Sequence, residues 1–315
     1  MISHAASGSV IEPGITEGKP LLGRAVVLTG AGQGIGAACA IAAANLGAKV
    51  VVNDIDGKRA DETCETIRKR GGIALANSED ISQWHQAGKL IDACVEEWGR
   101  IDGLVNNAAL FRMARLEEQS ESDARAMLEV NVMGTLACAA HAITHMRRQN
   151  AGSIVNVTSG AEMGEEAMGA YGATKGAVAS MTYAWAVETS GTPIRVNAIS
   201  PVGRTRMNEE WSGYRSKHLP ESVQLDSEQT VFPSSESNAP VVCFLLSDLA
   251  SGVHGQVVRT EGKKLSLMSH PAIALPILND DWTFIKITAA FDRELKQRQL
   301  PVGMAELESI FKAVT

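Results

Sequence analysis

The chain has 315 residues, 45% of them hydrophobic, which is enough for one large core or two smaller ones. Its formal net charge of -7 argues against a basic surface that binds nucleic acid. Five scattered cysteines without a CxxC pair indicate reduced, buried thiols and hence an intracellular protein, which we place in the cytoplasm. No membrane partner is expected, because glycines and polar side chains interrupt the apolar stretch 25–52.

Apolar strands and amphipathic or Ala-rich helices alternate along most of the chain. In chain order we expect a strand at 25–29, a helix at 35–46, a strand at 49–53, a helix at 58–70, a strand at 73–76, a helix at 84–98, a strand at 103–107, a helix at 123–148, a strand at 153–158, a helix at 171–188, a strand at 194–199 ended by Pro201, and a strand at 256–259. This alternation predicts an α/β fold with a single doubly wound parallel sheet, Rossmann-like and of about seven strands.

Three segments lie outside this pattern. Residues 1–20 are polar and contain several Gly and Pro residues, which is typical of a flexible tail. Residues 203–235 form a long insertion in the predicted Rossmann domain of residues 21–262, and insertions of this length are often functional lids. Residues 263–315 form a C-terminal extension with one amphipathic helix near 283–298.

The most informative motif is the turn Gly30-x-x-x-Gly34-x-Gly36, between the first expected strand and the first expected helix. Its glycines let a ligand approach the backbone closely, and the helix start offers free N–H groups and a partial positive charge. A dinucleotide pyrophosphate is the usual occupant of such a turn, although glycine turns also serve close packing alone.

Asp54 follows the second expected strand, eighteen residues after Gly36. A carboxylate at this spacing accepts hydrogen bonds from the adenosine ribose and repels a 2′-phosphate. Because neither Gln33 nor Ile55 is basic, the sequence favours NAD over NADP. The alternative for Asp54 alone is an ordinary turn residue.

Tyr171 and Lys175 lie four residues apart on one expected helix and therefore face the same way. A free phenol has a pKa near 10, and a neighbouring ammonium lowers it, which makes a proton shuttle for an alcohol or a ketone. Ser159, at the end of the fifth strand, could donate a hydrogen bond to a substrate oxygen or simply cap the strand. Each signal is weak alone, and Asn131 within the long helix reads equally well as a buried core amide.

In their order and spacing, these motifs resemble the short-chain dehydrogenase/reductase (SDR) family in its classical subtype, over Leu21 to Gly262. The resemblance rests on Thr29-Gly30-x-x-x-Gly34-Ile35-Gly36, Asn106-Asn107-Ala108-Ala109, Asn131, Ser159 and Tyr171-x-x-x-Lys175. The segment 195–201 is also similar to the sixth strand and proline turn of the family, which flank the nicotinamide.

The resemblance implies a catalytic tetrad and an NAD site. Tyr171 would be the general acid/base, and Lys175 would bind the nicotinamide ribose and depress the pKa of Tyr171. Ser159 would orient the reacting oxygen, and Asn131 would hold a water that links Lys175 to solvent. The implied cofactor-binding residues are Gly30, Gln33, Gly34, Ile35, Gly36, Asp54, Asp80 (at the adenine), Ile81, Asn107 (supporting the central strand), Ala108, Ala109, Tyr171, Lys175, Pro201 and Val202.

The chain departs from the family pattern at three turns. Ala109 and Val202 stand where the family usually has Gly, and Glu261-Gly262-Lys263 replaces Asp-Gly-Gly. These changes concern the shape of the substrate site more than the tetrad. The extension, together with Arg204-Thr205-Arg206-Met207, is weakly similar to the dehydrogenase domain of peroxisomal multifunctional β-oxidation enzymes.

The expected lid suggests what the substrate looks like. We assign Ser159, Arg204, Met207 and Trp211 to substrate binding. Apolar side chains beside basic ones (Arg206, Arg215, Lys217 and His218) suit a hydrophobic substrate with an anionic handle, such as a 3-hydroxyacyl-CoA. A solvated basic face explains the charges equally well, and a hydroxysteroid or cyclic alcohol would use the apolar part alone.

The sequence therefore predicts an NAD(H)-dependent oxidoreductase that interconverts a secondary alcohol and a ketone, with a small-molecule substrate. The family resemblance implies a homodimer or homotetramer in contact through the helices at 123–148 and 171–188. The alternative is a catalytically silent NAD(H)-binding redox sensor or scaffold. A zinc hydrolase is disfavoured, because His141 and His145 lack a third ligand, so no metal site is expected.

Overall fold

The computed structural model describes residues 18–205, 207, 210–211, 213–214, 232–273 and 276–299. Most of the expected tail and much of the expected lid, including Arg206, Arg215, Lys217 and His218, lie outside the described residues. So do residues 300–315 at the end of the expected extension. The domain boundaries drawn from the sequence stay predictions.

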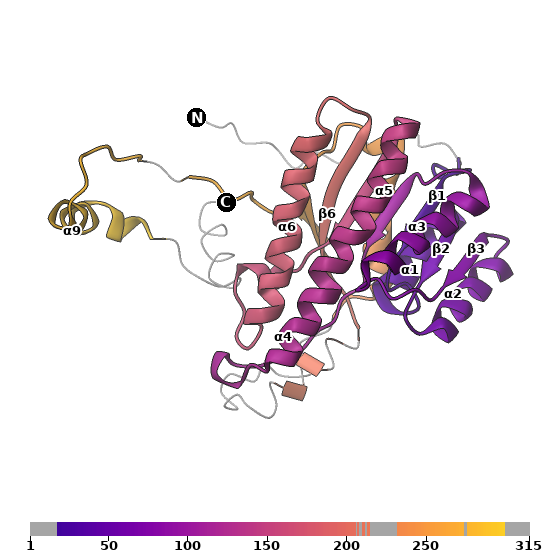
Figure 1. Ribbon diagram of the computed structural model, residues 1–315, viewed down its shortest axis with the longest axis horizontal. Helices are drawn as coiled ribbons and strands as arrows, with labels where there is room; N and C mark the ends of the chain where they lie inside the picture. Colours follow the sequence, from indigo (N-terminus) through magenta and orange to yellow (C-terminus); the bar gives the residue numbers. More distant parts are fainter. Residues whose placement is uncertain are drawn as a thin grey trace.

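Eight strands form one sheet in the order β3-β2-β1-β4-β5-β6-β7-β8 (Figure 1). Their bounds are β1 (Ala25–Leu28), β2 (Lys49–Asn53), β3 (Ile73–Asn77), β4 (Gly103–Asn106), β5 (Gly152–Val157), β6 (Ile194–Val202), β7 (Val257–Glu261) and β8 (Lys264–Leu267). The first seven run parallel, which confirms the doubly wound Rossmann-like sheet. β8 pairs antiparallel with β7 through a tight turn at Gly262 (φ +59), and the sequence analysis missed this hairpin.

Helices cover both faces of the sheet. Their bounds are α1 (Gly34–Asn45), α2 (Gly57–Lys69), α3 (Trp84–Trp98), α4 (Glu121–Met127), α5 (Thr135–Gln149), α6 (Gly169–Thr189), α8 (Ala239–Leu246) and α9 (Phe284–Arg293). Val26 and Leu28 of β1 pack with α1, α2 and α8, while Ala25 and Val27 pack with α3, α5 and α6. This alternation follows from the two-residue period of a strand, and it makes the central strands apolar on both faces.

The helix expected at 123–148 is interrupted. α4 passes into a π-helical segment, Leu128–Gly134, before α5 begins, and π-turns are frequent at functional sites. The whole stretch Glu121–Gln149 is long and apolar enough to cross a membrane. Nearly half of its most apolar window is buried inside the fold, as expected for a core helix.

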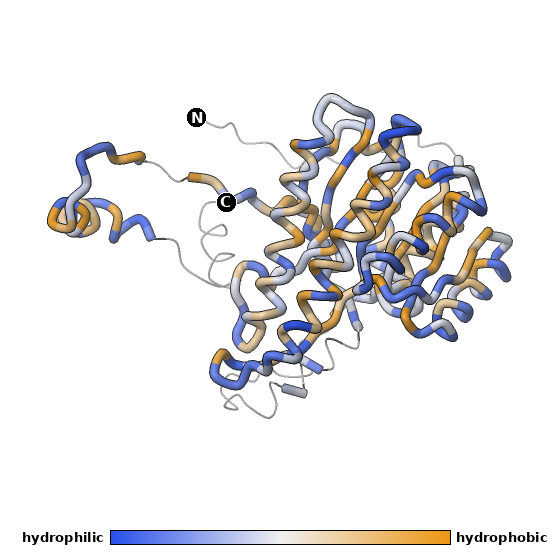
Figure 2. The backbone as a smooth tube through the Cα atoms, viewed as in Figure 1, coloured by the Kyte–Doolittle hydropathy of each residue, from blue (hydrophilic) through white to orange (hydrophobic). Residues whose placement is uncertain are grey.

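Three further elements differ from the sequence expectation. β6 continues through Pro201 to Val202, and these two residues still pair with β7. α8 was not predicted at all. In the extension, α9 stands apart from the sheet (Figure 1) and ends earlier than expected. Hydrophobic positions recur along α9 (Figure 2), and Phe284 and Ile285 are exposed.

Candidate active site

The glycine turn lies at the carboxyl edge of the sheet, where parallel α/β folds bind their ligands. Gly30 (φ +59) and Gly34 (φ +58) need positive φ. A Cβ at Gly30 would come within 2.6 Å of the Ala108 Cα, and one at Gly36 within 2.3 Å of the Gly30 carbonyl oxygen. No side chain caps the start of α1 after Gln33, and its first turn has no acidic residue. The free N–H groups of this helix start fit an anionic pyrophosphate.

Thr29 and Asn107 fasten the turn to β4. The Thr29 hydroxyl accepts hydrogen bonds from the N–H groups of Asn107 and Ala108, both at 3.1 Å. The Asn107 amide donates to the carbonyl oxygens of Thr29 (3.0 Å) and Gly30 (2.9 Å). The sequence analysis did not assign Thr29 to the site, although its place directly before the glycine motif was the available signal. Ala109 follows in the same loop.

Asp54 follows β2 beside the glycine turn. Its carboxylate accepts hydrogen bonds from the backbone N–H groups of Gly32 and Asp56, each at 3.0 Å. A Cβ at Gly32 would lie 2.7 Å from both this carboxylate and the Arg59 Cβ. Arg59 itself forms an ion pair with Asp56 at 3.2 Å. The structure therefore places a basic residue, Arg59, at this edge. The sequence analysis had looked for one only at positions 33 and 55.

Asp80 and Ile81 form the next turn along the same sheet edge, after β3. The Asp80 carboxylate accepts a hydrogen bond from the Ser82 N–H at 3.0 Å. Ile81 is buried, and a Cβ added at Gly134 of the π-helical segment would lie 2.9 Å from its side chain. This contact joins the predicted adenine side of the site to the helix that carries Asn131.

Pro201 and Val202 end β6 opposite the glycine turn. A Cβ at Gly203 would lie 3.3 Å from the Ile35 side chain, and one at Gly34 would lie 3.7 Å from Thr205. The Val202 carbonyl accepts a hydrogen bond from the Asn238 amide at 3.1 Å. The structure thus assembles the predicted cofactor residues of α1 and β6 along one edge, and their contacts with a cofactor stay predictions.

Tyr171, Lys175 and Ser159 come together where β5 ends and α6 begins. The Ser159 hydroxyl accepts a hydrogen bond from the Ala161 N–H at 3.2 Å and is near enough to the Tyr171 phenol to lower the pKa of that phenol. The Lys175 ammonium donates to the Val157 carbonyl at 2.8 Å and lies 5.7 Å from the centre of the Tyr171 ring. The Tyr171 phenol, the Ser159 hydroxyl and the Lys175 ammonium therefore lie close together, as acid–base chemistry at a carbonyl requires.

The lowered pKa expected for Tyr171 is not found. Burial of the phenol raises its pKa to about 12, and the nearby Ser159 hydroxyl only partly opposes this effect. Burial also lowers the pKa of Lys175 to about 8, which weakens the positive charge that was to stabilise a phenolate. The sequence analysis considered the charge of Lys175. It did not consider the desolvation of Tyr171 and Lys175, which disfavours the charged form of each group.

Asn131 holds the loop that follows β4. Its side chain accepts a hydrogen bond from the Leu110 N–H (2.7 Å) and donates to the Leu110 carbonyl (2.9 Å) and the Thr174 hydroxyl (3.0 Å). Both amide hydrogens are thus engaged, and only an oxygen lone pair is left for a water. In the predicted water-holding role of Asn131, a water could therefore bind only this oxygen. The same hydrogen bonds hold the Leu110 loop in place.

An apolar cluster surrounds the Tyr171 ring. Phe111 meets it edge-to-face at 4.9 Å between ring centres, and Met127 and Ala161 complete the buried group. Met207 and Trp211 of the expected lid pack against this cluster. The sequence analysis had named Met207 and Trp211 but not Phe111, because nothing local in the sequence marks it.

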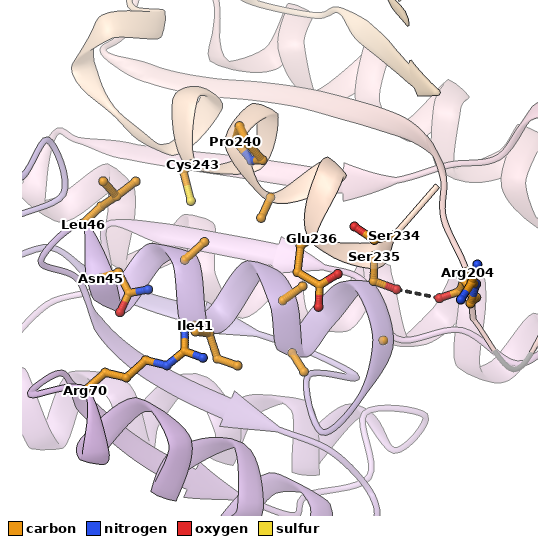
Figure 3. Close-up of a pocket in the computed structure, with 15 residues that line it drawn as sticks. Ile41, Asn45, Leu46, Arg70, Arg204, Ser234, Ser235, Glu236, Pro240 and Cys243 are labelled. Atoms are coloured by element: carbon orange, nitrogen blue, oxygen red, sulfur yellow. Dashed lines mark hydrogen bonds between the residues drawn. The ribbon is translucent and has the colours of Figure 1, made fainter. Parts of the chain in front are cut away.

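Arg204 has a different setting. It borders a groove of about 860 Å³ between α1 and α8, together with Ile41, Ser235 and Pro240 (Figure 3). The backbone carbonyl of Arg204 accepts a hydrogen bond from the Ser235 hydroxyl at 2.6 Å. This groove meets the glycine turn only at Gly34, so it is separate from the apolar cluster around Tyr171.

The two histidines considered for zinc have other partners. His141 contacts the Trp84 carbonyl at 3.2 Å, and His145 lies 3.7 Å from an oxygen of Asp92. Among the described residues there is no group of three or more potential metal ligands. The five cysteines are all buried and unpaired, and burial raises the pKa of each thiol.

A sequence model of the family described as enoyl-(acyl carrier protein) reductase matches residues 30–262, which include the glycine turn and the Tyr171–Lys175 pair. The chain belongs to the short-chain dehydrogenase/reductase family. An uncharacterised oxidoreductase of Methylorubrum extorquens is 36% identical over 77% of this SDR chain and 98% of its own length. Cis-4-hydroxycyclohexanecarboxylate dehydrogenase of Sinomonas cyclohexanicum is 33% identical over 78% and 98%.

A peroxisomal multifunctional enzyme, to which the sequence showed a weaker resemblance, is also among the relatives. The peroxisomal hydratase-dehydrogenase-epimerase of Saccharomyces cerevisiae is 36% identical over 59% of this chain, which corresponds to 22% of that longer protein. Among solved structures, a short-chain dehydrogenase from Mycobacterium avium has a TM-score of 0.77 at 30% identity and covers 90% of this chain and 98% of its own. An NAD⁺-bound xylitol dehydrogenase has a TM-score of 0.72 at 28% identity and covers 77% and 99%. The family model and these relatives show that the chain is an oxidoreductase.

Proposed function

We propose that this SDR is an NAD(H)-dependent dehydrogenase that interconverts a secondary alcohol and a ketone on a hydrophobic substrate. The observation that carries the proposal is the grouping of the Ser159 hydroxyl, the Tyr171 phenol and the Lys175 ammonium, with apolar side chains around the Tyr171 ring. A carbonyl oxygen between these two hydroxyls would receive two hydrogen bonds, which stabilise the charge that develops there.

In this proposal the bound nicotinamide supplies or accepts the hydride, and the chain handles the proton. Tyr171 donates a proton to the forming alkoxide in reduction and takes it back in oxidation. The raised pKa of Tyr171 keeps the phenol protonated at neutral pH, which suits the donor role. Ser159 orients the oxygen, and the Lys175 ammonium, anchored on Val157, replaces the proton that Tyr171 gives up.

The preference for NAD rests on Asp54. Its carboxylate stands beside the glycine turn, where it would accept hydrogen bonds from a ribose and repel a 2′-phosphate. Arg59 is nearby, but its ion pair with Asp56 engages its charge. The NAD⁺-bound state of the xylitol dehydrogenase relative agrees with this preference.

The apolar cluster supports a hydrophobic substrate. Phe111 and Met127 form a buried cluster with Tyr171, and Met207 and Trp211 pack against it, so the apolar part of a substrate would find apolar contacts there. The names of two relatives, a hydroxycyclohexanecarboxylate dehydrogenase and a peroxisomal hydratase-dehydrogenase-epimerase, are in keeping with a cyclic alcohol or a 3-hydroxyacyl-CoA as the candidates, along with a hydroxysteroid.

We further propose a homodimer or homotetramer in contact through the helical stretch Glu121–Gln149 and α6, in the cytoplasm. The outer part of α6 exposes Val187, and the buried, unpaired cysteines agree with a reducing compartment. Light scattering of the purified protein tests the assembly, and a monomer at micromolar concentration would contradict it.

The deciding experiment follows NADH absorbance with secondary alcohols and ketones of these three classes, using NAD and NADP in parallel. Tyr171→Phe should lower kcat by about 10² to 10⁴-fold while NADH binding, measured by fluorescence, is kept. The alternative, a silent NAD(H)-binding sensor or scaffold, predicts cofactor binding without turnover by either protein. For an acyl-CoA substrate, KM should rise with salt, because the anionic handle would be screened.

A further inference from the structure

The groove between α1 and α8 has the length and the lining of a helix-docking surface. It follows α1 from Gly34 to Leu46, which is about 18 Å at the rise of an α-helix. Ile41 lines it on the α1 side and Pro240 on the α8 side (Figure 3). Most of its remaining floor is made of alanines, namely Ala37, Ala38, Ala42 and Ala239. Small side chains between two helices leave room for large apolar side chains of a third helix.

Two arginines mark the ends of this groove. Figure 3 shows Arg70 beside Asn45 at one end and Arg204 at the other. Both arginines are exposed, and neither takes part in an ion pair within the described part of the chain. Glu236 lies on the rim between them, so the lining has a surplus of positive charge in a chain whose net charge is -7. An occupant with apolar side chains and a carboxylate near one end would fit this lining.

α9 is an amphipathic helix with one side left uncovered. Ile287 and Ala290 face the segment before the helix, where they line a pocket of about 350 Å³ together with Trp282. On another side of the helix, Phe284 is 85% exposed and Ile285 is 78% exposed. Large apolar side chains that stand together in water mark an interaction surface.

This uncovered side of α9 also carries an acidic residue. Asp292 follows Phe284 by eight residues and Ile285 by seven, so the helical period places the three on one side. The basic Arg293 lies opposite Phe284, nine residues away. Asp292 is exposed and has no ion pair among the residues that the structure describes. The stretch from Phe284 to Asp292 is about 12 Å long and therefore fits within the groove.

The extension leads α9 away from the groove of its own chain. His270 follows β8 closely, and its ring lies 4.4 Å from that of Tyr183 on α6. α6 packs on the face of the sheet opposite to α1 and α8. Figure 1 shows α9 well clear of α1, beyond α6. A second copy of the chain, in contrast, offers the same groove in any orientation that its docking requires.

We propose that α9 of one copy docks in the α1–α8 groove of a second copy. Phe284 and Ile285 then pack on the alanine floor, and Asp292 pairs with the arginine at one end of the groove. Reciprocal docking gives a two-fold symmetric exchange of C-terminal arms. This contact is separate from the helical contact through α6 proposed above, and it does not depend on the reaction that the enzyme catalyses.

Cross-linking of full-length chains tests the contact. Two chains with different tags are co-expressed, one with Asp292→Cys and the other with Arg70→Cys or Arg204→Cys. The five native cysteines are buried, so a short bismaleimide should react with the new thiols. A covalent heterodimer should form with one of the two arginine positions, which also gives the direction of α9 in the groove. Glu97→Cys, at an exposed position of α3 on the opposite face, is the control and should give no heterodimer.

Each other outcome overturns the proposal. If a chain that carries both new cysteines is linked only within itself, α9 occupies its own groove. If neither arginine position is linked, α9 does not occupy this groove. A dimer that forms through α6 alone has the same mass but lacks this cross-link, so light scattering does not replace the experiment.

Two substitutions on α9 test whether its uncovered side makes the contact. Phe284→Ala in the Asp292→Cys chain should lower the yield of heterodimer by about 10-fold, because a large apolar side chain is no longer buried. Arg293→Ala removes an exposed side chain of similar size from the opposite side and should leave the yield unchanged. Circular dichroism checks that both variants keep the fold. Equal yields from the two variants would overturn the proposed orientation of α9 and with it the docking.

Discussion

The side-chain amide of Asn107 donates two hydrogen bonds across the sheet edge, to the carbonyl oxygens of Thr29 at 3.0 Å and Gly30 at 2.9 Å. One side chain directly after β4 therefore fixes the backbone of the glycine turn after β1. The predicted cofactor site depends on this connection, because the two loops are 77 residues apart in the chain.

Asn107→Leu should loosen the turn. The substitution leaves two backbone carbonyl groups without their partner, at a cost of about 1–3 kcal/mol in the free energy of unfolding. The dissociation constant for NADH should also rise, because the turn is the expected binding surface. This rise should exceed the one that partial unfolding of the variant would cause. Urea titration and NADH fluorescence measure the two effects. The control, Asn45→Ala at an exposed position of α1, should leave both unchanged.

Gly36→Ala should be far more damaging than Gly169→Ala. A Cβ at Gly36 would lie 2.3 Å from the Gly30 carbonyl oxygen and 2.5 Å from the Asn107 amide, so the turn must distort. Gly169, at the start of α6, has no atom within 4 Å of its would-be Cβ, and Ala there should be neutral or stabilise by about 0.5 kcal/mol. Thermal unfolding and NADH binding distinguish the two. Similar losses in both variants would refute the packing argument.

The sequence was sufficient for those parts of the site that depend on local order. Gly30, Ser159, Tyr171 and Lys175 stand in a fixed sequence along a βα-alternating chain, and the parallel sheet brings the ends of its strands to one edge. Phe111 could not be found in this way. Its contact with Tyr171 joins a loop after β4 to α6, and no periodicity marks such a residue.

The acid–base properties were out of reach for a related reason. The distance between Tyr171 and Lys175 along a helix predicts an attraction between charges, but burial is a property of the whole fold. Burial raises the pKa of Tyr171 and Glu162 and lowers that of Lys175. In the sequence, Glu162 looks like any acidic residue in a turn. Only the packing of this turn against Gly172 shows that Glu162 is partly buried.

Asp54→Asn should shift the cofactor preference toward NADP. Loss of the negative charge removes the repulsion of a 2′-phosphate, and Arg59 lies close enough to attract it. We expect the ratio of kcat/KM for NADP over NAD to rise by about 10-fold or more, which corresponds to about 1.4 kcal/mol. Arg59→Ala added to Asp54→Asn should reverse most of that gain. Asp61→Asn, exposed on α2, serves as the matched control. An unchanged ratio would remove Asp54 from the cofactor site.

Glu162 should make the stability of the protein depend on pH. Its pKa is about 7 in the folded protein against an ordinary value of 4.5, so the folded state binds this proton more tightly than the unfolded state does. The resulting stabilisation is present below pH 4.5 and is lost as the pH rises through 7. Glu162→Gln lacks this loss. Its stability relative to the wild type should improve between pH 4.5 and 8 by about 1–2 kcal/mol, a value reduced for partial contact with water.

Urea titrations at the two pH values measure this difference, and Glu166→Gln should show no such trend, because its carboxylate is exposed. A constant gap between the wild type and Glu162→Gln would mean that the carboxyl group titrates normally in the fold.

Phe111→Ala should separate substrate binding from cofactor binding. The Phe111 ring is buried and packs edge-to-face on Tyr171, so its removal leaves a cavity that costs about 3–5 kcal/mol of stability. A hydrophobic ketone would lose apolar contact, and the Tyr171 ring would lose a support. We therefore expect kcat/KM to fall by at least 10-fold, with the loss greater for large apolar substrates than for small ones.

The dissociation constant for NADH should stay within about twofold, because the glycine turn and Asp54 are held by other contacts. Phe291→Ala, in the separate α9, is the aromatic control and should leave kcat/KM unchanged. Equal losses for large and small substrates would show that Phe111 supports Tyr171 without contacting the substrate.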